Sequence, residues 1–320
     1  MSLSAVGVAA ALAAAAGSGP PSVPSVPIVA PTAAPEAGNT AATQVDTTTD
    51  EGARLRVAVR IADQDWHFLI DSASTRSVIA SDVAAKLNLA RAGEVRVQNI
   101  GGVDKSASVI IPELGFSGIV MRNILAPALA RSNLGADGLL GLDMLKGRRL
   151  TMDFRHGAQL MIEPSSKQPD TKQEPDEPGT IIVTAKLRFG QLIVTDAEIE
   201  GQSVAVIIDT GSEDSIGNAP LRKLVSGRIA HSEIKPVLLL SVTGRLLPAD
   251  YTQIGRVRIG GVEVSNLPVA FAEAATFKQF GLARKPAILL GMGTLRLMEK
   301  ASIDFPRHEI RFVLGAKRAL

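Results

Sequence analysis

Two short acidic segments carry the residue types and spacing that could do chemistry in this chain. Residues 71–74 read Asp-Ser-Ala-Ser and residues 209–212 read Asp-Thr-Gly-Ser, each directly after an apolar run. Two carboxyl groups that share one site cannot both ionise at low cost, so the pair keeps a single proton over a broad pH range. The ionised member can activate a water while the protonated member donates to a scissile carbonyl. Asp71 and Asp209 are therefore predicted to hydrolyse an amide without a metal, a thiol or a covalent intermediate.

The residues after each Asp suit the close approach of two loops. The hydroxyls of Ser72 and Thr210 can bond the backbone of the opposite loop and lock the two loops together. Gly211 allows that approach, whereas the Cβ of Ala73 is expected to crowd its turn or to disfavour the required backbone conformation. Ala73 is thus the one residue of the two motifs that argues against activity.

The fourth residue of each motif, Ser74 or Ser212, adds a hydroxyl close to the carboxyl groups. A hydrogen bond from such a hydroxyl to an ionised carboxylate would lower the pKa of that carboxylate. We therefore expect an acid-shifted pH optimum.

Both acidic segments belong to an internal repeat. Period-two alternation predicts hairpins over residues 55–70 and 193–208, and in both the Asp follows the start of the turn by eight residues. Each half then has a glycine turn, and later the triplet Leu-Leu-Gly, at 139–141 and 289–291, before a predicted short helix and a closing hairpin. The repeat predicts two β-rich lobes in tandem.

At these residues the chain resembles the retropepsin-like aspartic proteases, as a tandem single chain like pepsin rather than a homodimer. Residues 209–212 with Leu-Leu-Gly at 289–291 match the family pattern closely, and residues 71–74 with Leu-Leu-Gly at 139–141 match it except at Ala73, where the family has glycine. The resemblance implies an all-β fold of two acid-protease β-barrel lobes, related by a pseudo-twofold axis, with one short helix per lobe.

The same resemblance implies roles for particular residues. Asp71 and Asp209 would be the catalytic dyad, and Ser72 and Thr210 would form an interlocking grip between the two loops. The hairpins with turns at Gly101, Gly102 and Gly244 would be flaps that close over a peptide or protein substrate held in an extended conformation.

Three interpretations of function remain open at this stage. The first is an aspartic endopeptidase that works as a monomer, with one site formed by both lobes. The second is a catalytically inactive peptide-binding module of the same fold, with the lobe 1 loop distorted by Ala73. The third is a homodimer in which exposed edge strands pair and the lobes combine between chains.

Composition shifts divide the chain into segments. Residues 1–16 include an apolar run the length of a signal-peptide core but have no basic residue in front of it, and they predict export to the periplasm or beyond. Residues 17–50 are rich in Pro, Ala and Thr and are expected to form a disordered linker. Lobe 1 is expected over 51–164 and lobe 2 over 181–320, with a polar, Pro-rich linker at 165–180 between them.

Composition also excludes several classes of protein. The chain has no Cys, so it has no disulfides, no thiol nucleophile and no Cys-ligated zinc, and its four His are scattered singly without metal-ligand spacing. Basic residues lie in short clusters without aromatic partners, and the net charge is +2, so nucleic acid is not an expected partner. No apolar run is long enough to span a membrane, and no phosphate-binding glycine motif occurs. No cofactor and no metal are expected.

Overall fold

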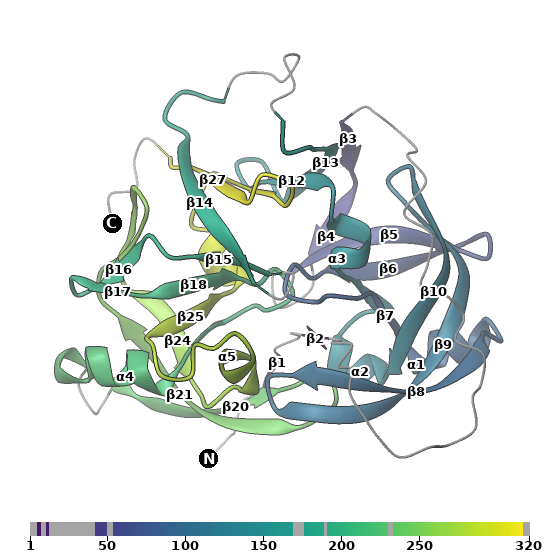
Figure 1. Cartoon of the computed structure of the whole chain (residues 1–320), viewed down its shortest axis with the longest axis horizontal. Helices are drawn as coiled ribbons and strands as arrows, with labels where there is room; N and C mark the ends of the chain where they lie inside the picture. Colours follow the sequence, from purple (N-terminus) through teal and green to yellow (C-terminus); the bar gives the residue numbers. More distant parts are fainter. Residues whose placement is uncertain are drawn as a thin grey trace.

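The computed structural model describes residues 42–49, 54–168, 176–188, 191–229 and 233–315, together with the backbone of two short strands at 5–7 and 11–12. These residues form two β lobes side by side, with strands of both lobes joined in a sheet above them (Figure 1). The predicted all-β fold with two tandem lobes is confirmed. Most of the predicted signal peptide and linker lies outside the described residues, as do residues 169–175 of the second linker.

The strands and helices of lobe 1 follow one another in this order: β4 (Thr47–Thr49), β5 (Leu55–Ile61), β6 (Gln64–Ile70), β7 (Val78–Ala80), α1 (Ser81–Lys86), β8 (Ala90–Asn99), β9 (Gly102–Phe116), β10 (Ile119–Leu129), α2 (Arg131–Leu134), β11 (Gly138–Leu140), α3 (Leu142–Leu145), β12 (Arg148–Asp153) and β13 (Gln159–Pro164). Buried and exposed residues alternate along β5, as expected of a strand with one face on the core.

Lobe 2 contains the following elements: β14 (Ile181–Arg188), β15 (Gln191–Val194), β16 (Ala197–Ile199), β17 (Gln202–Ser203), β18 (Ala205–Ile208), β19 (Ser215–Gly217), α4 (Ala219–Val225), η1 (Ser226–Arg228), β20 (Lys235–Leu240), β21 (Leu246–Ile254), β22 (Val257–Ile259), β23 (Val262–Val264), β24 (Leu267–Phe271), α5 (Ala275–Gln279), β25 (Ala287–Leu290), α6 (Met292–Leu295), β26 (Lys300–Asp304) and β27 (Glu309–Val313). Equivalent strands follow the same spatial order in the two lobes, β8-β9-β10-β7-β11-β6-β5-β4 in lobe 1 and β20-β21-β24-β19-β25-β18-β15-β14 in lobe 2, and lobe 2 adds a four-stranded sheet, β17-β16-β22-β23.

One three-strand arrangement occurs in both lobes and positions the acidic motifs. In lobe 1, β11 runs parallel to β6 and antiparallel to β7, so it lies between the strands on either side of the Asp71 loop. In lobe 2, β25 lies in the same way between β18 and β19, on either side of the Asp209 loop. The two leucines of each Leu-Leu-Gly run therefore lie in a central strand, where they are fully buried, and these strands fix where each loop emerges.

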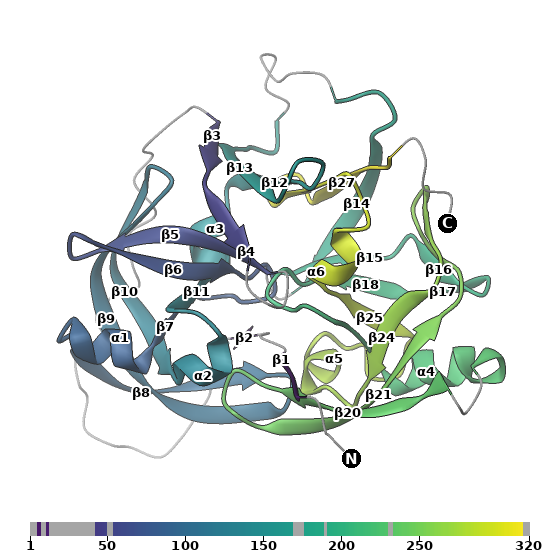
Figure 2. The same cartoon turned by 180° about the vertical axis from the view of Figure 1, so that it is seen from behind.

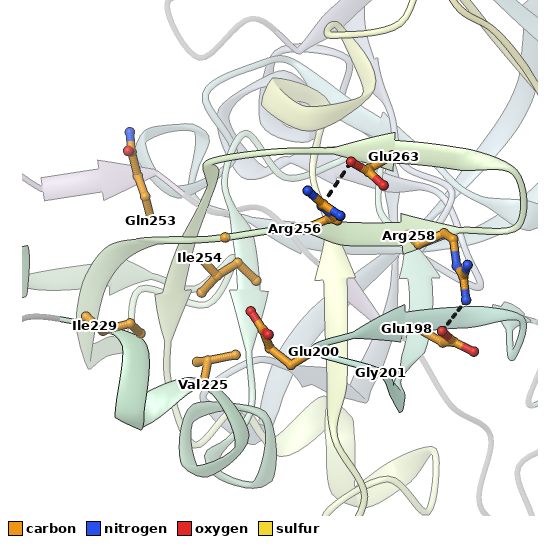
Figure 3. Close-up of a pocket in the computed structure, with 11 residues that line it drawn as sticks. Glu198, Glu200, Gly201, Val225, Ile229, Gln253, Ile254, Arg256, Arg258 and Glu263 are labelled. Carbon is orange, nitrogen blue, oxygen red and sulfur yellow. Dashed lines mark hydrogen bonds and ion pairs between the residues drawn. The ribbon is translucent and has the colours of Figure 1, made fainter. Parts of the chain in front are cut away.

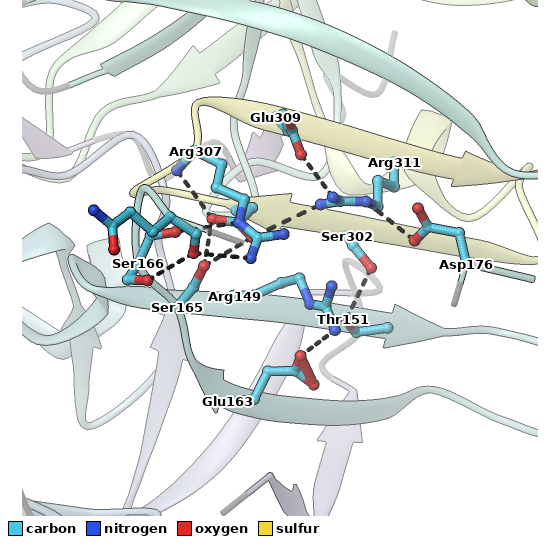
Figure 4. Close-up of polar contacts among 12 residues, drawn as sticks. Arg149, Thr151, Glu163, Ser165, Ser166, Asp176, Ser302, Arg307, Glu309 and Arg311 are labelled. Carbon is cyan, nitrogen blue, oxygen red and sulfur yellow. Dashed lines mark hydrogen bonds and ion pairs between the residues drawn. The ribbon is translucent and has the colours of Figure 1, made fainter. Parts of the chain in front are cut away.

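Six strands at one end of a 14-stranded sheet join the lobes, and we call them the six-stranded sheet. Their order is β14-β27-β26-β12-β13-β3, with β12 of lobe 1 antiparallel to β26 of lobe 2. Polar side chains also cross this junction. Ser165 Oγ donates to both carboxylate oxygens of the buried Asp304, at 2.8 and 2.9 Å. Thr151 shares a 2.8 Å hydroxyl–hydroxyl bond with Ser302 (Figure 4). The junction holds the two lobes in one fixed arrangement.

Two expectations about local structure need correction. The end of the expected linker is ordered, because β3 (Thr43–Val45) pairs with β13 and β4 pairs with β5. These segments are rich in Thr, a β-branched residue that suits a half-buried strand when a partner edge is available. Only tertiary pairing supplies that edge.

The number of helices is also larger than expected. A short helix does follow each Leu-Leu-Gly run, as α3 and α6, but the described residues contain three α-helices in each lobe rather than one. For α4 a sequence signal exists: Asn218 caps the helix by accepting a hydrogen bond from Leu221 N at 3.0 Å, and Pro220 lies in the first turn.

Candidate active site

Asp71 and Asp209 lie at the ends of equivalent strands, β6 and β18, and both are fully buried. The backbone of each is tied to the central strand of its lobe: Asp71 N donates to Leu140 O at 2.9 Å, and Asp209 N donates to Leu290 O at 3.0 Å. The sequence forms these loops because an apolar strand ends where polar turn residues begin.

The structure brings the two carboxyl groups into one site. Burial, and after it the negative charge of Asp71, raise the pKa of Asp209 well above its ordinary value, against the lowering effect of backbone hydrogen bonds from Gly211 and Ser212. Within the described part of the chain, Oδ2 of Asp209 has no hydrogen-bond partner although it is buried. A pair of this kind retains a proton at pH values at which isolated Asp side chains are ionised.

The second residue of each motif, Ser72 in lobe 1 and Thr210 in lobe 2, connects the two loops. Ser72 Oγ donates to Ile208 O at 3.0 Å and accepts from Thr210 N at 3.1 Å. Thr210 Oγ1 donates to Ile70 O at 2.9 Å and accepts from Ser72 N at 2.9 Å. These four buried hydrogen bonds cross between the lobes and leave neither hydroxyl unsatisfied, so they fix the separation of the two Asp residues.

Ala73 fits its turn without the expected conflict. Ala73 N donates to Asp71 Oδ1 at 2.9 Å, and Gly211 N makes the equivalent bond to Asp209 Oδ1 at 3.1 Å. Neither Ala73 nor Gly211 is among the described residues with a positive φ, so the turn does not need the left-handed conformation that favours glycine. The expectation that the Ala73 backbone would be disfavoured is therefore wrong.

The expectation for Ser74 and Ser212 also needs correction. Ser74 Oγ donates to Arg76 O at 2.6 Å, and Ser212 Oγ donates to Asp214 O at 2.7 Å. A hydroxyl has one proton to donate, so these side chains brace their own loops and do not donate to the catalytic carboxylates. Their hydroxyls give no reason for an acid-shifted optimum.

The predicted glycine turns lie at the tips of two hairpins, β8–β9 and β20–β21, which we call the flap hairpins. Gly102 and Gly244 have φ values of 133° and 88°, which explains why glycine is needed at both turns. In both views the two flap hairpins extend toward each other from opposite lobes, on the side of the molecule away from the six-stranded sheet (Figures 1 and 2).

A polar cluster ties the two flap tips together, and we call it the flap latch. Asp104 accepts hydrogen bonds from Arg245 Nε at 2.7 Å, from Thr243 Oγ1 at 2.6 Å and from Asn99 Nδ2 at 3.0 Å. Partial burial alone would raise the pKa of Asp104, but these hydrogen bonds and the charge of Arg245 lower it below its ordinary value. The latch is therefore charged at all but strongly acidic pH.

Ile100 anchors the lobe 1 flap tip in lobe 2. Its side chain is fully buried in a cluster otherwise formed by lobe 2 residues, among them Phe277 and Phe280, and Ile100 O accepts a hydrogen bond from Ala275 N at 2.8 Å. The two flap tips are therefore held against each other and against lobe 2.

Two protein-family models match this chain in tandem. The model for gag-polyprotein "putative aspartyl protease" covers residues 57–147, and the model for aspartyl protease covers residues 195–294, so each match contains one acidic loop. The chain belongs to the retropepsin-like aspartic proteases. A separate comparison with curated proteins found no match.

Sequence reasoning overlooked two buried polar residues of this retropepsin-like site. Gln191 Nε2 donates to Ala73 O at 2.8 Å, and Arg54 Nη1 contacts Gly211 O at 3.4 Å. A signal for both was available, because each lies opposite the motif Asp of its own lobe when the hairpin register is extended by two residues. Polar residues are common at the starts of strands, so a polar residue opposite each motif Asp does not stand out in the sequence.

One pocket of the retropepsin-like fold lies in lobe 2, away from the two Asp residues. It has a volume of about 690 Å³ and is lined by residues of β16, β22 and β23, by the ends of β21 and α4, and by Ile229 (Figure 3). The arginines on its wall already have carboxylate partners, Arg256 with Glu263 at 3.0 Å and Arg258 with Glu198. It leaves no unpaired arginine to attract an anionic ligand.

The described residues contain no group of three or more His, Asp or Glu placed to hold a metal ion. They also contain no helix with the length and apolar character needed to cross a membrane.

Proposed function

We propose that this protein is an aspartic endopeptidase that hydrolyses peptide bonds with a water activated between Asp71 and Asp209. The observation that carries the proposal is the pair of buried carboxyl groups at equivalent strand ends, each held by the N–H of the third residue of its motif. Because Ala73 makes the same bond as Gly211, the favoured reading is the active enzyme rather than the inactive binding module.

The environment of the pair suggests how the roles divide. With its pKa raised by burial and by Asp71, Asp209 keeps the shared proton and donates to the scissile carbonyl oxygen. Asp71 takes a proton from the attacking water. When the tetrahedral intermediate collapses, Asp71 gives this proton to the leaving amine and Asp209 takes its own proton back from the oxygen that becomes the new carboxyl group. Backbone N–H groups hold both carboxyls in place throughout.

An extended peptide is the ligand that this arrangement suits. Residues 5–7 of the chain pair in parallel with β20, and residues 11–12 pair antiparallel with β8. An extended segment that crosses a pseudo-twofold axis must run parallel to one flap hairpin and antiparallel to the other, so these pairings have the geometry expected of a bound peptide. Strand addition of this kind recognises backbone and tolerates many sequences.

Two wider properties belong to the same proposal. Since one chain supplies both Asp residues, we infer a monomer, which light scattering after size exclusion would test against a homodimer. The apolar segment at residues 1–16 would direct export, and fusing residues 1–50 to a reporter that is active only outside the cytoplasm would test this.

The decisive experiment measures cleavage of a denatured protein by the full chain from pH 3 to 8. Asp71→Asn and Asp209→Asn should each lower the rate by about 10²–10⁴-fold, and pepstatin should inhibit the wild type. Asp153→Asn is the matched control, because Asp153 lies outside the site and pairs with Arg155. Folded wild-type protein that binds the peptide without cutting it at any pH would instead establish the binding module.

A further inference from the structure

Arg54 and Gln191 occupy equivalent positions in the two lobes. In the β5–β6 hairpin Arg56 lies opposite Leu69, so two residues earlier Arg54 lies opposite Asp71. In lobe 2 Ile193 of β15 lies opposite Ile207 of β18, which places Gln191 opposite Asp209. The pseudo-twofold axis therefore relates a charged side chain to a neutral one.

Each of the two side chains reaches across to the loop of the other lobe. Gln191 Nε2 donates to Ala73 O at 2.8 Å, while Arg54 Nη1 contacts Gly211 O at 3.4 Å. Both side chains are almost completely buried, with exposed fractions of 1% for Gln191 and 7% for Arg54. Each braces the third residue of the opposite motif, whose N–H holds the catalytic carboxyl group.

Arg54 is also confined from its own lobe. A Cβ added at Gly135, at the C-terminal end of α2, would lie 2.6 Å from Arg54 Nη2, and Gly135 itself has a φ of 73°. The guanidinium group is thus held between the end of α2 and the Asp209 loop. A flexible surface arginine would not be packed in this way.

The positive charge of Arg54 acts on Asp209. It opposes the effects of burial and of Asp71 on Asp209, whose pKa is raised overall. The charged groups around Asp209 are Asp71 from the opposite loop and Arg54, with Glu213 and Asp214 farther along its own loop. At the equivalent place in lobe 2, Gln191 carries no charge.

We propose that Arg54 and Gln191 are paired positioning residues of the dyad, and that the single positive charge of Arg54 makes the two catalytic carboxyl groups electrostatically unequal. The bracing role is shared by both residues, whereas the inequality depends on Arg54 alone. The inference deepens the proposed function and rests on it only for the activity measurement.

The test compares Arg54→Gln, Arg54→Lys and Gln191→Leu in the full chain. Arg54→Gln restores symmetry and should move the high-pH limb of the pH–rate profile upward by about one pH unit, because a nearby positive charge that favoured ionisation is lost. Arg54→Lys keeps the positive charge but loses the planar guanidinium group that braces the Asp209 loop. The kcat should therefore fall, while the high-pH limb of the pH–rate profile should not move. Gln191→Leu removes a brace without a charge and should also lower kcat without moving the limb.

A second measurement separates this inference from the proposed function. Titration of ¹³C-labelled Asp carboxyl groups by NMR, with signals assigned through Asp71→Asn and Asp209→Asn, reports proton binding even if the protein cuts no peptide. The Asp209 titration should move to higher pH in Arg54→Gln. An unchanged titration and an unchanged limb in Arg54→Gln, or a limb that shifts in Arg54→Lys as well, would overturn the electrostatic role of Arg54.

Discussion

Ala73 and Gly211 make the same contact in the two lobes: each donates its backbone N–H to the carboxylate of the Asp two residues earlier, at 2.9 Å and 3.1 Å. Ala73 is fully buried and has no positive φ, so its Cβ is accommodated. The difference in sequence between the two motifs therefore does not produce a difference in how the carboxyl groups are held.

Ala73→Gly should leave cleavage within about threefold of wild type and lower stability by about 0.4–1 kcal/mol, because glycine has more freedom in the unfolded chain. Peptide-cleavage kinetics and urea unfolding would measure the two effects. Activity that appears only in Ala73→Gly would show that the alanine blocks the site, and the inactive-module interpretation would then hold for the natural sequence.

The raised pKa of Asp209 predicts a pH-dependent cost in stability. In the unfolded chain Asp209 ionises around its ordinary pKa of 3.8, but in the folded protein burial and Asp71 keep it protonated to higher pH. The contribution of Asp209 to the free energy of unfolding is therefore fully present below pH 3.8. It is lost as the pH rises through the pKa that Asp209 has in the folded protein.

Asp209→Asn should accordingly melt at the same temperature as wild type near pH 3.5 and at a higher temperature at neutral pH, by roughly 2–4 °C for each kcal/mol relieved. Calorimetry at several pH values would check this. Asp153→Asn is a control of opposite sign, since hydrogen bonds from Arg155 lower the pKa of Asp153 and stabilise the protein at neutral pH. A Tm gain in Asp209→Asn that does not change with pH would contradict the argument.

Removing the Thr210 hydroxyl should loosen the connection between the loops. Thr210→Val keeps the shape of the side chain but leaves Ile70 O and Ser72 N without their Thr210 partner in a buried site, at a cost of about 1–3 kcal/mol for each group. Urea unfolding would measure the loss, with Ser226→Ala as control because that hydroxyl bonds Lys223 O at the surface. A loss below about 0.5 kcal/mol would mean that the four-bond grip contributes little.

The flap latch predicts a local change in backbone protection. Arg245→Ala removes the ion pair with Asp104, to which solvent-exposed Arg245 contributes little because water screens the charges. Hydrogen exchange at Ala275 N, which bonds Ile100 O, should then accelerate up to about fivefold. Arg122→Ala is the matched control, because it removes a pair with Glu113 away from the flap tips. Equal exchange in both variants would show that the Arg245–Asp104 pair does not hold the two flap tips together.

Local patterns in the sequence were sufficient for the architecture and for the two Asp residues. The strands that end at Asp71 and Asp209 are predictable because alternation of apolar residues reflects one buried face, and the repeat of Leu-Leu-Gly at matching distances marks two copies of one fold. The short helices α3 and α6 follow from the same repeat.

Only the tertiary structure decided what lies between the lobes. Whether Ser74 Oγ bonds a carboxylate or a carbonyl depends on a rotamer, and whether Ala73 fits depends on the φ of one turn, neither of which composition or spacing specifies. The bonds of Gln191 and the latch at Asp104 join residues more than 100 positions apart. Such contacts form because two separately predictable lobes pack in one particular orientation, and that orientation comes from non-local pairing such as β12 with β26.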